Sequence, residues 1–92
     1  MIQSFGDGET EKLFHGMPIK QFEAFERIAR RKLEMVNASV SVTDLKVPPG
    51  NRLERLKGNR SKYYSIRIND QWRICFIWKD GGAYEAEIED YH

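Results

Sequence analysis

Three strand-like runs follow one another in the second half of the chain, and they restrict the fold more than any other feature. The runs cover residues 63–68, 72–78 and 83 to about 91, and the turn-forming residues Asn69-Asp70 and Asp80-Gly81-Gly82 separate them. Connections this short join antiparallel neighbours. The sequence therefore predicts a three-stranded antiparallel meander.

Successive strand residues point to opposite faces, so this meander has one apolar and one polar face. The apolar face carries Tyr64, Ile66, Ile68, Trp72, Ile74, Phe76 and Trp78. The opposite face carries Tyr63, Ser65, Arg67, Gln71, Arg73, Cys75 and Ile77. We expect the apolar face to pack against a helix and the polar, cationic face to suit a polyanion such as RNA.

The first half of the chain predicts a short strand and two helices. Residues 2–5 form the strand, Asp7 can cap a brief helix that Gly16 ends, and Pro18 suits the first turn of a longer helix. That helix carries an apolar stripe with spacings of three and four, formed by Phe22, Phe25, Ala29, Leu33 and Val36.

Residues 37–51 lose the helical period and contain Pro48-Pro49-Gly50-Asn51, which predicts an extended segment and a turn. The expected fold class is α+β, with an N-terminal strand and two helices packed on an antiparallel sheet of three to four strands.

Length and composition favour one globular domain over residues 1–92, with 40% hydrophobic and 32% charged residues. Cys75 is the only cysteine, and its neighbours Ile74 and Phe76 indicate a buried thiol. No apolar run approaches the roughly 20 residues that span a bilayer, and the N-terminus lacks the features of a signal peptide. We therefore expect a cytoplasmic protein without membrane association.

The net charge of +1 conceals an uneven distribution along the chain. Residues 52–73 hold seven Lys and Arg against two acidic residues, whereas residues 79–92 hold one Lys against five. The basic cluster includes Arg52, Arg55, Arg60 and Arg67, which are candidate RNA-binding residues. A self-neutralising surface is the alternative interpretation.

The residue types exclude several kinds of chemistry and leave acid–base catalysis. The sequence has no metal-ligand cluster, phosphate-binding glycine loop or cysteine–histidine nucleophile pattern, so we expect no metal and no cofactor. Cutting RNA without a metal needs a base for the 2′-hydroxyl, cations at the phosphate and an acid for the leaving oxygen. All three types occur in the second half of the chain.

The terminal residues Asp90, Tyr91 and His92 are candidates for such acid–base work. If the last strand continues to its end, Asp90 and His92 share one face about 7 Å apart and Tyr91 points to the other. Histidine exchanges a proton near neutral pH, and Asp90 could orient it or act as a base. A frayed polar tail is the alternative.

Four segments together resemble the HigB toxins of the RelE-like group of type II toxin–antitoxin systems. They are Leu56-Lys57-Gly58-Asn59-Arg60, Tyr64-Ser65-Ile66-Arg67-Ile68, Gln71-Trp72-Arg73-Ile74-Cys75-Phe76 and Asp90-Tyr91-His92. Their order and spacing also fit, and the resemblance runs from Ile2 to His92. It implies the RelE-like microbial ribonuclease fold, ribosome-dependent mRNA cleavage and neutralisation by a HigA-type helix-turn-helix antitoxin.

The resemblance also assigns roles to individual residues. Lys57 and Arg73 match the cations that contact phosphate, and Asp90, Tyr91 and His92 match the C-terminal catalytic group. His92 would act as general acid or base. We expect both cations to face the RNA rather than the core, although Tyr91 could equally serve in packing.

This sequence departs from the family pattern at two positions. Some members carry a histidine three residues before the lysine that matches Lys57, and this chain has Glu54 there. Glu54 could accept the 2′-hydroxyl proton, or it could be a surface glutamate paired with Arg52 or Arg55. Arg67 is one residue out of register with an arginine of some members and receives no catalytic role.

Two other functions use the same sequence features. A ParE-like toxin shares the fold but poisons DNA gyrase, and it would not need the terminal Asp90-Tyr91-His92 with Lys57 and Arg73. A plain RNA-binding or partner-binding module would need only the basic stretch. Codon preference and the docking position of the antitoxin do not follow from the sequence.

Overall fold

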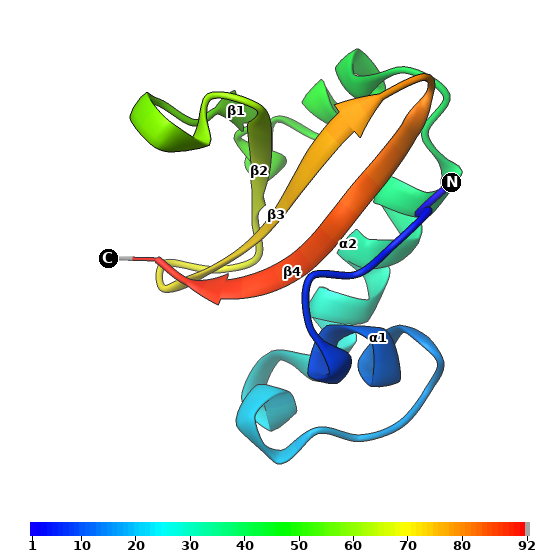
Figure 1. Ribbon diagram of the computed structural model, residues 1–92. Coiled ribbons are helices and arrows are strands. Elements are labelled where there is room, and N and C mark those ends of the chain that lie inside the picture. The colour runs from blue at the N-terminus through cyan, green and yellow to red at the C-terminus, as the bar shows by residue number, and fades with distance from the viewer. Residues whose placement is uncertain (92) are drawn as a thin grey trace.

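A four-stranded antiparallel sheet with helices against one face forms the protein, as a computed structural model that describes residues 1–91 shows (Figure 1). The strands are β1 (Glu54–Arg55), β2 (Tyr63–Arg67), β3 (Trp72–Lys79) and β4 (Gly82–Asp90), in the spatial order β1-β2-β3-β4. This arrangement confirms the α+β fold and the predicted meander. β1 was not predicted, because two residues are too few to show an alternating pattern.

The two predicted helices are present. α1 (Gly8–Phe14) begins after Asp7, whose side chain accepts a hydrogen bond from the Thr10 backbone N–H at 3.1 Å. α1 ends just before Gly16, which adopts a positive φ of 96°. Both predicted ends of this helix are confirmed.

α2 (Glu26–Ala38) follows a 3₁₀ turn at Lys20–Phe25, so the long helical segment has two parts. Pro18 precedes this segment instead of lying in its first turn, because Ile19 is still extended with a φ of −119° and a ψ of 119°. The predicted start was therefore two residues too early.

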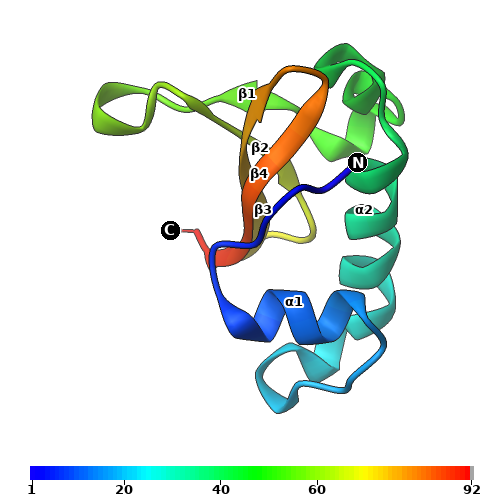
Figure 2. The same ribbon diagram turned by 45° about the vertical axis from the view of Figure 1, so that its right-hand side comes forward.

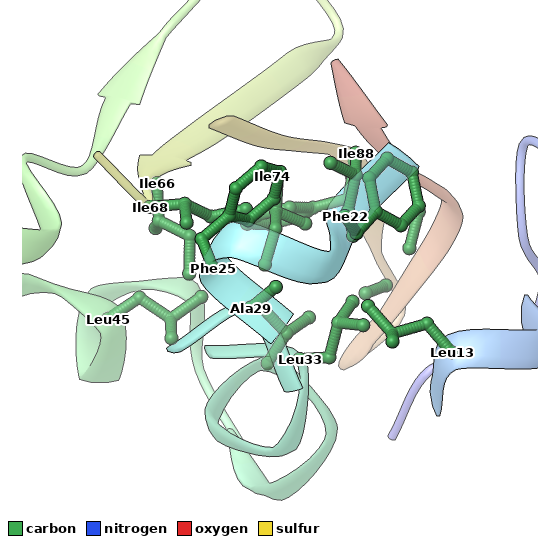
Figure 3. Packing of buried hydrophobic residues seen from close by; sticks show 14 residues of the cluster. Leu13, Phe22, Phe25, Ala29, Leu33, Leu45, Ile66, Ile68, Ile74 and Ile88 are labelled. Atoms are coloured by element: carbon green, nitrogen blue, oxygen red, sulfur yellow. The ribbon is translucent and has the colours of Figure 1, made fainter. Parts of the chain in front are cut away.

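The core lies between α2 and the covered face of the sheet (Figure 3). All five residues of the predicted stripe are buried, namely Phe22, Phe25, Ala29, Leu33 and Val36. They meet β2 and β3 through Ile66, Ile74 and Phe76, which have no exposed surface. The predicted apolar face of the sheet is confirmed, and the opposite face is left without a covering helix.

The N-terminal segment is less regular than expected. Ile2 and Phe5 form isolated parallel bridges with Ala83 and Ala86 of β4, but the segment does not form a full strand. Figures 1 and 2 show it running beside β4 before it enters α1. The segment does pair with the edge of the sheet beside β4, as the predicted strand would, but only through these two bridges.

Residues 42–51 contain two 3₁₀ turns, at Val42–Lys46 and Pro49–Asn51, where the sequence predicted an extended segment and one turn. The side chain of Asn51 helps to hold these two turns in place. It is fully buried, and its side-chain amide donates to the Leu45 carbonyl at 3.2 Å and to the Val47 carbonyl at 3.3 Å. These bonds hold the two 3₁₀ turns together, and the Lys32 ammonium on α2 donates to the Asn51 side-chain oxygen.

The described residues include no helix that is long and apolar enough to cross a bilayer.

Candidate active site

Arg73 lies at the centre of the uncovered face of the sheet, in β3. Only 8% of the residue is exposed. Its Nε donates to Ser65 Oγ at 2.9 Å, and its Nη2 donates to the Arg52 carbonyl at 2.9 Å. The guanidinium therefore has a fixed position, and these contacts offset part of the cost of burying its charge.

Two further groups lie beside the Arg73 guanidinium. Glu54 Oε1 lies 3.5 Å from Arg73 Nη2, and the ring of Tyr91 packs 5.1 Å from the guanidinium carbon. Arg73 Nη1 has no hydrogen-bond acceptor among residues 1–91 and is accessible to solvent. One edge of a well-positioned arginine is thus available to an anionic ligand.

Strand pairing explains why these side chains meet. Glu54 pairs with Ser65, and Ser65 pairs with Cys75, so their side chains point to the same face. Arg73 belongs to the next row on that face. The two-residue strand β1 therefore decides the position of Glu54.

An open cleft of about 480 Å³ lies beside this group. Its walls are formed by Glu54, Arg55, Leu56, Lys57, Arg60 and Tyr91. Figures 1 and 2 show the loop after β1 and the end of β4 on the same side of the molecule, away from α2. Three of the predicted catalytic residues, Glu54, Lys57 and Tyr91, thus share one cleft, and Arg73 touches two of them.

The cations of the cleft differ in how firmly they are held. Lys57 is exposed, and its ammonium has no hydrogen-bond or ion-pair partner within residues 1–91. Arg60 instead forms two hydrogen bonds with Glu89, at 2.8 and 2.5 Å, and lies 4.7 Å from the centre of the Tyr63 ring. Lys57 is the cation that is free to reach a phosphate.

The other basic residues named from the sequence have separate surroundings. Arg52 contributes its carbonyl to Arg73, while its own side chain is exposed. Arg55 donates to the Ser61 carbonyl at 2.7 Å and lies 5.6 Å from the Tyr64 ring. Arg67 forms an ion pair with Asp70. Glu54 forms its ion pair with Arg73. The sequence had suggested Arg52 or Arg55 as its partner, and neither forms that pair.

Asp90 does not lie beside Arg73. It pairs with Trp72 at the end of β4, and directly opposed residues share a face, which here is the face that Trp72 turns toward Phe22 and Phe25. Gln71 Nε2 donates to Asp90 Oδ2 at 3.1 Å. β4 ends at Asp90, one residue before the predicted end near Tyr91. His92 lies outside the described residues.

A bulge in β4 brings acidic side chains to the uncovered face. Cys75 pairs with Glu87, whereas Ile77 pairs with Tyr84, so β4 holds one extra residue opposite β3. Glu85 takes up this residue with a positive φ of 53°. The shift keeps Ala86 and Ile88 in the core and turns Glu87 and Glu89 toward the cleft side.

Cys75 lies under the uncovered face and is fully buried, as its apolar neighbours predicted. Burial raises the pKa of its thiol to about 12, with a further contribution from the nearby Glu89 carboxylate. The thiol is therefore a packing group rather than a nucleophile.

Comparison with known proteins identifies the family. A family model for the RelE-like toxin of type II toxin-antitoxin system HigB matches residues 3–92. The chain belongs to this HigB family. It is 46% identical to a protein named Endoribonuclease HigB from Proteus vulgaris, across all of both chains. It is also 41% identical to Toxin HigB-1 of Vibrio cholerae over 68 residues, which are 74% of this chain and 72% of the relative.

The fold of this HigB-family chain also resembles that of a chain in a distant solved structure. A chain in the YoeB-YefM complex from Staphylococcus aureus matches with a TM-score of 0.62 and 21% identity, covering 100% of this chain and 98% of the other. This likeness supports the fold assignment.

Arg73 lies on the uncovered face, as the sequence predicted, but its side chain is buried there, where the sequence indicated an accessible cation. Arg73→Ala should lower the free energy of unfolding by about 1–3 kcal/mol, because it leaves the buried Ser65 hydroxyl without its partner. The exposed Arg27→Ala on α2 is the matched control and should change it little. Urea unfolding of both variants measures the difference, and equal midpoints would contradict a structural role for Arg73.

Proposed function

We propose that this chain is a ribosome-dependent endoribonuclease that cuts mRNA and so inhibits translation. The observation that carries the proposal is a cleft lined by Glu54, Lys57 and Tyr91, of which Glu54 and Tyr91 also contact the buried Arg73. A carboxylate, a free ammonium and an arginine with one open edge match the groups that phosphodiester cleavage needs. Membership of the HigB toxin family and the name of the Proteus vulgaris relative support the same activity.

The proposed reaction starts with attack by the 2′-hydroxyl oxygen on the adjacent phosphorus. The 2′-proton passes to a base, the bond from phosphorus to the 5′-oxygen breaks, and an acid protonates that oxygen. We assign the base to Glu54 and the acid to His92. Arg73 and Lys57 would stabilise the negative charge that grows on the phosphate oxygens.

Asp90 and Tyr91 would have supporting roles. The ring of Tyr91 packs on the Arg73 guanidinium, so Tyr91 would hold that cation in place. Asp90 precedes His92 by two residues and would orient the end of the chain. Arg52 and Arg55 would contact the RNA backbone near the cleft, while Arg60 and Arg67 are already paired with carboxylates.

The exposure of part of the site supports the proposed dependence on the ribosome. Lys57 and Glu54 are exposed side chains on a cleft open to solvent, so free RNA would rarely meet them in a reactive arrangement. The ribosome would present the mRNA in a fixed conformation and reduce this entropic cost. We further propose a cytoplasmic location and a HigA-type helix-turn-helix antitoxin as the partner that neutralises the toxin.

The proposed function predicts that single-turnover cleavage requires both the ribosome and the 2′-hydroxyl. Ribosome-bound mRNA should be cut rapidly, naked mRNA much more slowly, and mRNA with a single 2′-deoxy nucleotide at the cut site not at all. Gel analysis of labelled mRNA measures each rate. Equal cutting of the deoxy substrate would contradict 2′-hydroxyl attack, whereas DNA damage in cells without RNA cleavage would favour a gyrase poison.

A second prediction concerns His92. His92→Gln keeps hydrogen-bonding capacity but cannot exchange a proton near neutral pH, so cleavage should fall about 10²–10⁴-fold while the melting temperature stays nearly unchanged. Asp90→Asn should give a smaller defect if Asp90 only orients the histidine. Wild-type cleavage rates in His92→Gln would mean that the terminal residue is a polar tail, and the acid role would then move to Tyr91.

A further inference from the structure

The Arg60–Glu89 ion pair joins the loop after β1 to the last strand. Arg60 Nη1 donates to Glu89 Oε1 at 2.8 Å, and Arg60 Nη2 donates to Glu89 Oε2 at 2.5 Å, so the guanidinium and the carboxylate form a two-pronged contact. The two side chains are 40% and 21% exposed. A bidentate pair of this kind fixes direction as well as distance.

The loop that carries Lys57 has few other attachments. Lys57 precedes the 3₁₀ turn Gly58–Arg60, and residues 57–59, 61 and 62 are all exposed. Among residues 1–91, Arg60 makes the only side-chain hydrogen bonds from residues 57–62 to another part of the sheet. Figures 1 and 2 show this loop projecting from the body of the molecule. Without Glu89, the loop would keep only the Arg55 bond to the Ser61 carbonyl, the Leu56 N–H bond to the Tyr63 carbonyl and its local turn contacts, all of them next to the loop in the sequence.

Arg60 is itself poorly suited to bind a phosphate in this arrangement. Both terminal nitrogens bond to Glu89, and the guanidinium also lies against the Tyr63 ring. Glu87, in the same row of β4 side chains, adds negative charge nearby and would repel a phosphate. These contacts favour a structural use of Arg60 over direct RNA binding.

We propose that Glu89 is a positioning residue of the active site, which acts through Arg60 to hold the 57–60 loop over the sheet and so places Lys57 relative to Arg73. This inference rests on the proposed function, because only RNA cleavage gives the position of Lys57 a consequence. The competing role for Arg60, a phosphate ligand that leaves Glu89 when RNA binds, makes opposite predictions.

The test is steady-state cleavage of ribosome-bound mRNA by Glu89→Gln, with kcat and KM measured separately. Loss of the carboxylate should release the loop and lower kcat about 10–100-fold, with little change in KM. Arg60→Gln should give the same loss, and the double variant should be no worse than either single variant. The control is Glu26→Gln, which breaks the exposed 3.3 Å pair with Arg30 on α2 and should leave kcat unchanged.

Two further measurements separate positioning from folding and from phosphate binding. Amide hydrogen exchange of residues 57–60 should speed up in Glu89→Gln while that of β3 stays slow. The slope of log affinity for single-stranded RNA against log salt should fall by about 0.7 in Lys57→Gln and stay unchanged in Arg60→Gln. The charge-exchanged variant Arg60→Glu with Glu89→Arg should recover part of kcat.

Three outcomes would overturn the proposal. Wild-type kcat in Glu89→Gln would show that the pair does not position the loop. Tighter RNA binding by Glu89→Gln, together with a smaller salt slope in Arg60→Gln, would make Arg60 a phosphate ligand. A wild-type protein that does not cleave ribosome-bound mRNA would remove the proposed function and this inference together, whereas the first two outcomes leave RNA cleavage intact.

Discussion

The contact between Arg73 and its three partners is the interaction on which the uncovered face of the sheet depends. Moving a guanidinium out of water costs several kcal/mol unless its donors are used. Here Ser65, the Arg52 carbonyl and Glu54 accept from it or lie close to it, and they come from β2, the segment before β1, and β1. One side chain of β3 thus fixes the backbone that leads into β1 and the strand that carries Glu54.

The site that results has a buried half and an exposed half. Arg73 and Tyr91 pack against each other on the sheet, whereas Lys57 and the Glu54 carboxylate reach into the cleft with much exposed surface. A site of this kind holds one phosphate-binding group ready and leaves the others to be ordered by a substrate in a fixed conformation. That division agrees with an enzyme whose substrate is held by a larger assembly. The Arg60–Glu89 pair would hold the loop that carries Lys57.

Local patterns predicted most of the fold, because alternation in β2 and β3 and the stripe of α2 are properties of neighbouring residues. Contacts between residues far apart in the sequence were harder to predict. Local sequence patterns do not reveal the bulge at Glu85. They also do not reveal the hydrogen bonds between Arg60 and Glu89, which are 29 residues apart. The two-residue strand β1 and the N-terminal bridges to β4 depend on their partners in the same way.

The sequence predicted which residues form the candidate site better than it predicted how they are arranged. Lys57, Tyr91 and Glu54 were named from the sequence and meet in one cleft, but the burial of Arg73 was not expected, because strand alternation gives the face of a side chain and not its depth. The same alternation put Arg73 and Ser65 on one face without showing that they bond. Asp90 was named with Arg73 and lies on the other face, since its partner across the strand is Trp72.

Mapping of RNA 5′ ends in a translating extract is the sharpest test of ribosome-dependent mRNA cleavage, because it locates each cut to a single nucleotide. Addition of the wild-type protein should create new 5′ ends within translated reading frames, and these ends should disappear when ribosomes are removed. Arg73→Lys keeps the charge but loses the planar fork, so the new ends should be nearly absent when it is added at the same concentration of folded protein. The same set of ends with Arg73→Lys as with the wild type would contradict the account.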